Sequence, residues 1–189
     1  MKRLLLILTG IILSSFAGFT QDFNALNFID GYVENHGQIT DQNGKTNDQV
    51  KFLFAGAYGM NVQLRTSGFS FDLYENSGSS IRMHRIDVSF IGANKSFVIR
   101  PQQRIPIQSS HYIAGSAGKC IADVYEEVIY ENMYDNIDLV FKKTASGQVK
   151  YDIVLHPGAH LSDIQLHYAG SDGMSISDGQ LELENSIRP

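Results

Sequence analysis

The stretch KYDIVLHPGAH, Lys150–His160, decides the class of fold, because its apolar residues recur at every second position. An extended chain places alternate side chains on opposite faces, so this pattern predicts a strand with one buried face and one wet face. The apolar face comprises Val149, Tyr151, Ile153 and Leu155. Pro157 disfavours a helical backbone at His156, so we expect the strand to end there in a Pro-Gly turn.

The same period of two residues recurs along most of the chain. It predicts strands at residues 50–54, 60–64, 69–73, 86–90, 137–141, 149–155, 164–168 and 181–183. Turn-forming residues separate these strands: Asn43-Gly44, Ser67-Gly68, Ser77-Gly78, Gly92-Ala93-Asn94, Ser146-Gly147, Asp172-Gly173 and Asp178-Gly179. Strands at intervals of about ten to fifteen residues, without a convincing helix between them, predict an all-β fold, either an antiparallel β-sandwich or a partly closed barrel.

One segment is open to two interpretations. VYEEVIYENMY, Val124–Tyr134, contains glutamates that suit a helix, whereas its tyrosines and β-branched residues favour a strand. We expect the strand, because β-branched and aromatic side chains fit a pleated, half-buried surface.

The first residues have the composition of a secretory signal peptide. Lys2 and Arg3 provide a positive start, and Leu4–Phe16 is an almost unbroken apolar run that is too short to span a bilayer comfortably. Small residues follow, so we expect cleavage after Ala17 or Thr20. A short membrane anchor or a buried helix is the alternative. The expected location is therefore the secreted fraction or the cell surface.

The predicted organisation has three parts. Residues 1–20 form the signal peptide, residues 21–48 an irregular polar lead-in, and residues 49–189 a β-sandwich domain. The sequence stops at LELENSIRP, in or just after a predicted strand, so we expect the domain to be truncated at its C-terminus. After signal cleavage no apolar segment approaches the length of a membrane span.

Composition excludes some classes of binding partner and shows which interactions must stabilise the domain. Loss of Lys2 and Arg3 with the signal peptide takes the formal net charge from −5 to −7. This charge argues against nucleic acid and anionic membrane surfaces as partners, because both require basic patches. No cysteine lies near the cleavage region, so lipid anchoring is not expected. Cys120 is the single cysteine and cannot form an intrachain disulfide, so the core must stabilise the domain.

The histidines of the opening stretch could act as paired metal ligands if a helical turn brought His156 and His160 together. Pro157 makes that pairing hard to build, because the residue before a proline avoids the helical region. His167 follows on the polar side of the next predicted strand. We therefore predict strand-end and loop histidines, with no metal site.

Other residue types allow catalytic hypotheses. Cys120 could be a nucleophile with His111 as its base, but the spacing matches no known motif, and a lone cysteine is more often a small core residue. Two carboxylate pairs could serve in acid–base chemistry: Glu126 with Glu127, and Asp135 with Asp138. Adjacency in sequence does not support them, because separation in space decides that chemistry. We predict no catalytic residue, no cofactor-binding residue and no cofactor.

Two acidic loops offer oxygen ligands for calcium. They are DQNGKTND, Asp41–Asp48, and SDGMSISDG, Ser171–Gly179. Neither has the spacing of an EF-hand loop. The second resembles two Asp-Gly turns that bracket a short strand, Met174–Ser177, so we expect structural turns in both places.

Five blocks of the sequence resemble a recurring bacterial domain. FIDGYVENHGQI (Phe28–Ile39) is similar to an F-x-E-N-x-G-Q opening, and Gln49–Glu75 and His84–Asn94 follow its next strands. HYIAGSAGK (His111–Lys119) resembles a further block but lacks its tryptophan. The most specific match is Val128–Gly173, which contains NIDLVF, VKYDIVLHPGA and YAGSDG. The resemblance covers nearly all of the mature chain.

These blocks identify the family as an uncharacterised β-rich domain at the N-terminus of large secreted bacterial proteins. The resemblance implies that such proteins continue into seven-bladed β-propeller (SBBP) repeats and other extracellular modules. It also implies type IX secretion sorting domains or gliding-motility-associated domains at their C-termini. It brings no catalytic residues, and it implies a domain with several more strands than this sequence holds.

The function expected from these observations is that of an exported, non-enzymatic β-rich module with a structural or interaction role. A glycan-binding or calcium-binding module is the alternative, and a hydrolase domain is less favoured. The expected partners are downstream propeller modules of a longer chain, or an extracellular protein or glycan.

Overall fold

The computed structural model describes residues 30–41, 43–56, 59–77, 80–112 and 119–187. The predicted signal peptide lies outside these residues. The strands are β1 (Tyr32–Glu34), β2 (Val50–Gly56), β3 (Met60–Arg65), β4 (Gly68–Ser77), β5 (Ser80–Phe90), β6 (Val98–Tyr112), β7 (Lys119–Tyr134), β8 (Ile137–Lys143), β9 (Val149–Leu155), β10 (Leu166–Ala169), β11 (Gly173–Ser177) and β12 (Gln180–Glu184). A 3-10 turn, η1 (Leu161–Asp163), precedes β10. The predicted all-β class is confirmed, and so is the strand at Val124–Tyr134, which belongs to β7.

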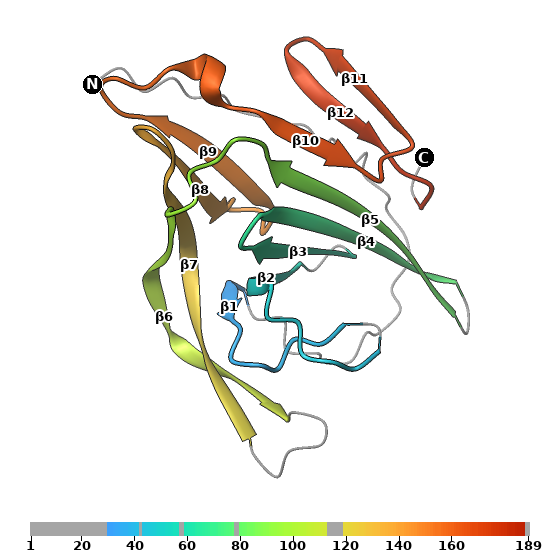
Figure 1. Cartoon of the computed structure of the whole chain (residues 1–189). Coiled ribbons are helices and arrows are strands. Elements are labelled where there is room, and N and C mark those ends of the chain that lie inside the picture. Colours follow the sequence, from blue (N-terminus) through green and yellow to red (C-terminus); the bar gives the residue numbers. More distant parts are fainter. Residues whose placement is uncertain (1–29, 42, 57–58, 78–79, 113–118, 188–189) are drawn as a thin grey trace.

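Ten strands form one antiparallel sheet that curls into a half-barrel (Figure 1). The sheet forks at β7, whose long course lets different strands share one edge. Along that edge Val124 and Tyr125 pair with β1, and the residues from Glu127 onward pair with β8. The opposite edge pairs with β6. One arm of the fork is β1-β2-β3-β4-β5-β10, the other is β8-β9, and β11 and β12 form a separate hairpin.

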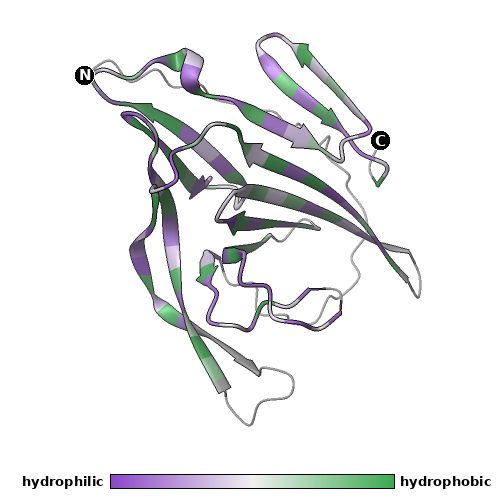
Figure 2. Cartoon of the chain, in the orientation of Figure 1, coloured by the Kyte–Doolittle hydropathy of each residue, from purple (hydrophilic) through white to green (hydrophobic). Residues whose placement is uncertain are grey.

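The hydrophobic core lies between the two arms. Figure 2 shows polar and apolar residues alternating along the strands, as expected for strands with one buried face. Phe69 of β4 lies near the centre, with ring centroids 5.0 Å from Phe141 and 5.4 Å from Tyr151 on the other arm. Both Phe69 and Phe141 are fully buried. The period-two pattern therefore supplies the facing surfaces that hold the half-barrel together.

A hydrogen bond ties the turn between β3 and β4 to the opposite side of the core. Tyr130 of β7 is fully buried, and its hydroxyl donates to the carbonyl of Arg65 over 2.8 Å. Gly68 follows in this turn, where a Cβ atom would lie 1.9 Å from the carbonyl oxygen of Val88. Only glycine lets β5 approach so closely at this point.

The structure differs from the prediction at two strands. Tyr32–Glu34, inside the segment predicted as an irregular lead-in, forms β1 between β2 and β7, and its Tyr32 is fully buried. No strand is predicted for residues 98–112, yet they form the 15-residue strand β6. A smaller shift affects β10, which begins at Leu166, whereas Ile164 caps η1.

Candidate functional site

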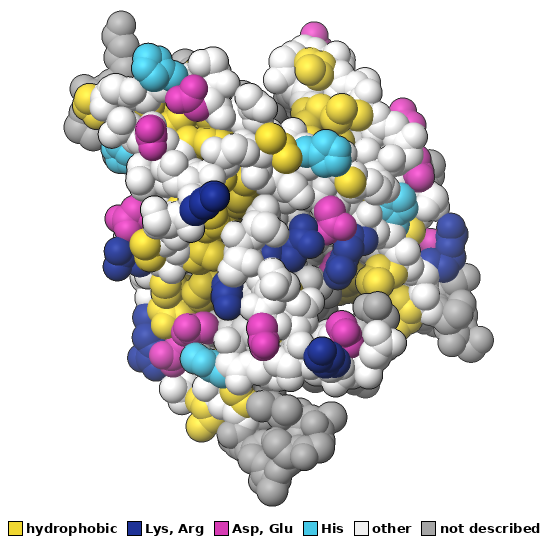
Figure 3. Space-filling view, viewed as in Figure 1, with side chains coloured by type: hydrophobic (Ala, Val, Ile, Leu, Met, Phe, Trp, Pro, Cys, Tyr) yellow, Lys and Arg dark blue, Asp and Glu magenta, His cyan; other side chains and the backbone are white. Residues whose placement is uncertain are grey.

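A cleft of about 490 Å³ lies between the β1–β2 region and the first residues of β6. Its walls come from four segments that are distant in sequence: residues 34–35, 51–52, 66 and 95–101. Figure 3 shows hydrophobic side chains gathered on the β6–β7 side of the molecule, with lysine and arginine side chains beside them. The cleft therefore lies where β6 and the loop before it meet the β1–β2 region.

The cleft has an apolar floor and a charged rim. Phe52 and Phe97 contribute to the floor. Phe52 is only 4% exposed, and Phe97 is half-buried against the ring of Tyr130 at a centroid distance of 5.6 Å. The exposed Lys51 and Lys95 are also among the lining residues and give the cleft a charged rim. Such a cleft can accept an apolar side chain and place a carboxylate beside a lysine.

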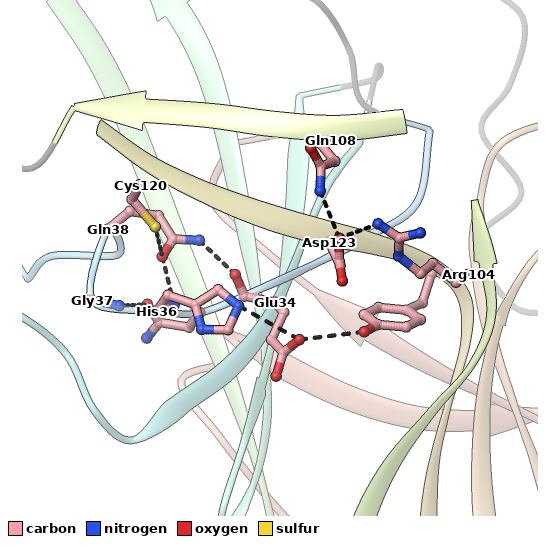
Figure 4. A network of polar contacts seen from close by, with 10 residues as sticks. Glu34, His36, Gly37, Gln38, Arg104, Gln108, Cys120 and Asp123 are labelled. Carbon is pink, nitrogen blue, oxygen red and sulfur yellow. Dashed lines mark hydrogen bonds and ion pairs between the residues drawn. The ribbon is translucent and has the colours of Figure 1, made fainter. Parts of the chain in front are cut away.

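Glu34 gives the rim a negative group and connects it to a polar network across β1 and β7 (Figure 4). The hydroxyl of Tyr125 donates to the Glu34 carboxylate over 3.4 Å, and His36 Nε2 lies 3.6 Å from the same carboxylate. Partial burial, and then the charge of Glu34, raise the pKa of Tyr125. The tyrosine is therefore a neutral donor that fixes the position of Glu34.

A second part of this network lies on the β6–β7 ribbon. Arg104 Nη2 donates to Asp123 over 2.7 Å, and Gln108 Nε2 donates to the same carboxylate oxygen over 3.2 Å. These two hydrogen bonds, that of Arg104 first, lower the pKa of Asp123. These two contacts, from Arg104 before the register shift and Gln108 after it, hold β6 against β7 on both sides of the irregularity.

Asn35 positions the loop beside the cleft through four side-chain hydrogen bonds. Its side-chain nitrogen donates to the carbonyls of Asn47 and Val50, and its side-chain oxygen accepts from the amides of Gly37 and Ile39. One side chain thus joins the loop after β1 to the start of β2. The sequence ENHGQ could have indicated this loop, because an asparagine two residues before a glycine favours an Asx-type turn.

Gln38 completes the same loop. Its side-chain nitrogen donates to the carbonyl of Glu34 over 2.6 Å, and its side-chain oxygen accepts from the amide of His36, also over 2.6 Å. Cys120 Sγ lies 3.7 Å from that oxygen. Cys120, which the sequence favours as a small core residue over a nucleophile, therefore contacts an amide side chain. The backbone register sets His111 opposite Cys120, but the side chain of His111 lies outside the description.

The histidines of the opening stretch lie directly after β9 and at the start of η1. His156 Nε2 lies 2.7 Å from a carboxylate oxygen of Asp138, and the other oxygen of Asp138 accepts from the amide of Asn132. His160 is exposed at the start of η1, and His167 is exposed on β10. The contact of His156 with Asp138 ties the end of β9 to the start of β8.

The candidate carboxylate pairs have structural contacts of their own. Glu126 and Glu127 are successive residues of β7 and project to opposite faces, and Glu127 lies 3.5 Å from Lys142. Asp135 accepts from Asn94 over 3.1 Å, which ties the β5–β6 loop to the turn between β7 and β8. Asp138, the other member of the second pair, contacts His156 and the amide of Asn132.

The two acidic loops are built as turns. One carboxylate oxygen of Asp41 accepts from the amides of Asn43 and Lys45, at 2.8 and 2.9 Å. The Lys45 and Asn43 amides lower the pKa of Asp41. Asp172 and Asp178 flank β11, so roughly 20 Å of extended chain separates them. A single ion cannot contact both aspartates.

In the part of the chain that the structure describes, no group of three or more histidine, cysteine, aspartate or glutamate residues could hold a metal ion. Among the same residues no helix has the length and apolar character that crossing a membrane requires.

Comparison with known proteins places the chain in a family. Among curated proteins and solved structures the comparisons find no match. A family model does match, and it covers residues 32–189, from the first residue of β1 to the end of the chain. The match includes the Glu34–Gln38 loop and the walls of the cleft. The chain therefore belongs to the family described as "Domain of unknown function (DUF7948)".

Proposed function

We propose that this chain is an exported, non-enzymatic interaction module that binds an extended polypeptide in the cleft between β2 and β6. The observation that carries the proposal is the combination of an apolar floor with two exposed lysines at the rim. A polypeptide segment offers matching chemistry, because one of its apolar side chains can enter the cleft while a neighbouring carboxylate meets Lys51 or Lys95.

The floor supports a polypeptide more than a glycan. Sugar rings stack on flat aromatic faces that are open to solvent, whereas Phe52 is 4% exposed and Phe97 packs against Tyr130. The floor therefore offers apolar edges and aliphatic groups from Ile99 and Pro101. These surfaces suit an aliphatic or aromatic side chain of a peptide.

The proposed setting is outside the cytoplasm. The sequence of residues 1–20 supports export, and the resemblance supports a position ahead of propeller repeats in a secreted or cell-surface protein. Sorting through the type IX system, and an association with gliding motility, form part of the same proposal. A polypeptide ligand fits this setting, because segments between neighbouring modules of such a protein are extended chains.

The binding test uses an array of extended peptides of varied sequence, with a glycan array probed in parallel. We expect the chain to bind peptides that combine an apolar residue with acidic residues. The double variant Lys51→Glu/Lys95→Glu should weaken that binding about tenfold or more, because each substitution replaces an attraction with a repulsion. Lys45→Glu is the matched control, since Lys45 is exposed and does not line the cleft.

Two results would contradict the proposal. One is selective binding on the glycan array with none on the peptide array. The other is peptide binding that the single variants Lys51→Glu and Lys95→Glu reduce no more than the Lys45→Glu control, because all three change the total charge equally and such binding would not depend on the cleft.

A further inference from the structure

The edges of the large sheet differ in how they discourage pairing with another chain. An open strand edge carries unpaired backbone groups, and proteins block such edges with proline, bulges or short strands. β6 is long, but it is blocked by Pro101, Pro106, a left-handed Gln103 at φ 57° and a register shift after Ile105. β10, at the end of the longer arm, has only four residues.

β9, at the end of the shorter arm, is not blocked in this way. Its seven residues pair with β8 in unbroken register from Val149 to Leu155, without proline, glycine or a bulge. Among the strands that the structure describes, β8 is its single partner. Its second edge is therefore regular and unpaired along the length of the strand.

The register shows which backbone groups this open edge presents. The amide of Thr144 donates to Gln148, and the amide of His156 donates to Asn136, at the two ends of the β8–β9 ladder. Hydrogen-bonded residues alternate along an antiparallel pair, so the even-numbered residues of β9 point their backbone groups at β8. The amides and carbonyls of Val149, Tyr151 and Ile153 consequently point outward from the sheet.

The side chains beside this edge carry balanced charges. Lys150 and Asp152 project from the outer face of β9, and their charged groups lie 3.5 Å apart. Lys142 of β8 stands directly opposite Lys150 in the register, and both ammonium groups lie near the carboxylate of Asp152, at 3.9 and 3.5 Å. Because Lys150 shares this carboxylate with Lys142, a further carboxylate on the open side of Lys150 would be favourable.

We propose that β9 is an interface strand through which two copies of this chain associate. The two β9 strands pair antiparallel about a two-fold axis, so that one sheet continues through both copies. Tyr151 lies on the axis, where its outward amide and carbonyl exchange hydrogen bonds with the same groups of the second copy. Val149 then faces Ile153 of the second copy, and the half-buried apolar faces of the two strands become continuous.

Charge selects this register among the available ones. With Tyr151 on the axis, each Lys150 stands opposite Asp152 of the second copy in a non-hydrogen-bonded pair, where side chains approach most closely. A shift that places Asp152 on the axis would pair more residues, but it would set the two Asp152 carboxylates against each other. The sequence of the strand is thus complementary to itself only in the first register.

The test measures self-association of the exported chain by sedimentation velocity over a concentration series. We expect a monomer–dimer equilibrium. Lys150→Asp places aspartate opposite aspartate twice in each dimer, so it should weaken association about tenfold. The charge-swapped variant Lys150→Asp/Asp152→Lys restores both attractions and should recover the dimer. Recovery distinguishes a specific register from a general effect of charge or folding.

Ile176→Ser is the matched control, because Ile176 is an exposed apolar residue of the separate β11–β12 hairpin, at 77% exposure. It should leave association unchanged. The proposal is overturned if the chain stays monomeric over the whole series, or if the charge-swapped variant remains as weak as Lys150→Asp. It is also overturned if Ile176→Ser abolishes the dimer, since the interface would then be the hairpin.

Discussion

Asp72 shows how a single residue can fix a polar surface of the sheet. It lies on the outer face of β4 and is 4% exposed, so its carboxylate must find its partners within the protein. Arg85 donates to it twice, over 2.5 and 2.9 Å, and Gln63 donates over 2.7 Å. The hydrogen bond to Asp72 raises the pKa of Arg85 in turn. Three neighbouring strands are thereby joined through one carboxylate.

Replacing Arg85 tests this arrangement. Arg85→Met leaves Asp72 buried with one donor, and we expect the free energy of unfolding to fall by about 2 kcal/mol. The value lies below that of a fully buried pair because the Arg85 side chain is 39% exposed. Urea unfolding measures the change. The double variant Arg85→Met/Asp72→Leu should recover most of the loss, and an Arg85→Met variant as stable as the wild type would refute this role.

At the scale of elements, β1 is a three-residue strand that depends on its flanking contacts. Gly31 before it admits close packing, because a Cβ atom there would lie 2.6 Å from Val124 Cγ1 and 2.9 Å from the carbonyl oxygen of Tyr125. Asn35 after it supplies four hydrogen bonds to the loop and to β2. So short a strand holds its place between β2 and β7 through these two residues.

Asn35→Ala should therefore loosen the loop more than it unfolds the domain. We expect a loss of about 2 kcal/mol in unfolding free energy, because the substitution leaves partly buried carbonyls and amides without partners. Hydrogen exchange should become faster at the amides of Gly37 and Ile39 in particular. Gln49→Ala, at an exposed position, is the control and should change stability by less than about 0.5 kcal/mol. Unchanged exchange at both amides would contradict the assignment.

Elements of clear periodicity could be predicted from the sequence, and β1 and β6 could not, for different reasons. β1 is shorter than any recognisable pattern, and its stability comes from partners around residues 52–54 and 124–125. β6 contains Pro101 and Pro106, which normally argue against a strand and are accommodated because β6 is an edge. Half of the cleft belongs to β6 and its preceding loop, so the cleft could not be predicted either.

At the scale of the whole molecule, the fork at β7 explains both the core and the cleft. Because β1 and β8 share one edge of β7, the two arms diverge and their apolar faces turn toward each other.

The buried interior between the arms includes tyrosine hydroxyls. Burial, and then the charge of Glu127, raise the pKa of Tyr32, and burial also raises the pKa of Tyr130. These two side chains stay neutral in the folded protein where unfolded tyrosines ionise.

This difference predicts a loss of stability at alkaline pH. A group whose pKa is raised by folding contributes full stability below its unfolded pKa, about 10 for tyrosine, and loses it as the pH rises further. Tyr32 and Tyr130 together contribute about 3 kcal/mol per pH unit to the slope above that value, and Tyr151, whose pKa burial also raises, adds to it. Urea unfolding as a function of pH, with tyrosinate absorbance as a second signal, measures the slope. The rise in absorbance that comes from Tyr32 and Tyr130 should coincide with unfolding, because these hydroxyls ionise only on unfolding.

Two variants separate ionisation from hydrogen bonding. The hydroxyl of Tyr32 is buried without a hydrogen-bond partner among the described residues, so Tyr32→Phe should keep stability at neutral pH and reduce the alkaline slope by about 1.4 kcal/mol per pH unit. Tyr130→Phe should reduce the slope equally but also cost about 1 kcal/mol at neutral pH, because it loses the hydrogen bond to Arg65. An unchanged slope in both variants would contradict this account. It would show that other groups cause the alkaline unfolding and that the two hydroxyls are not kept from water in the folded protein.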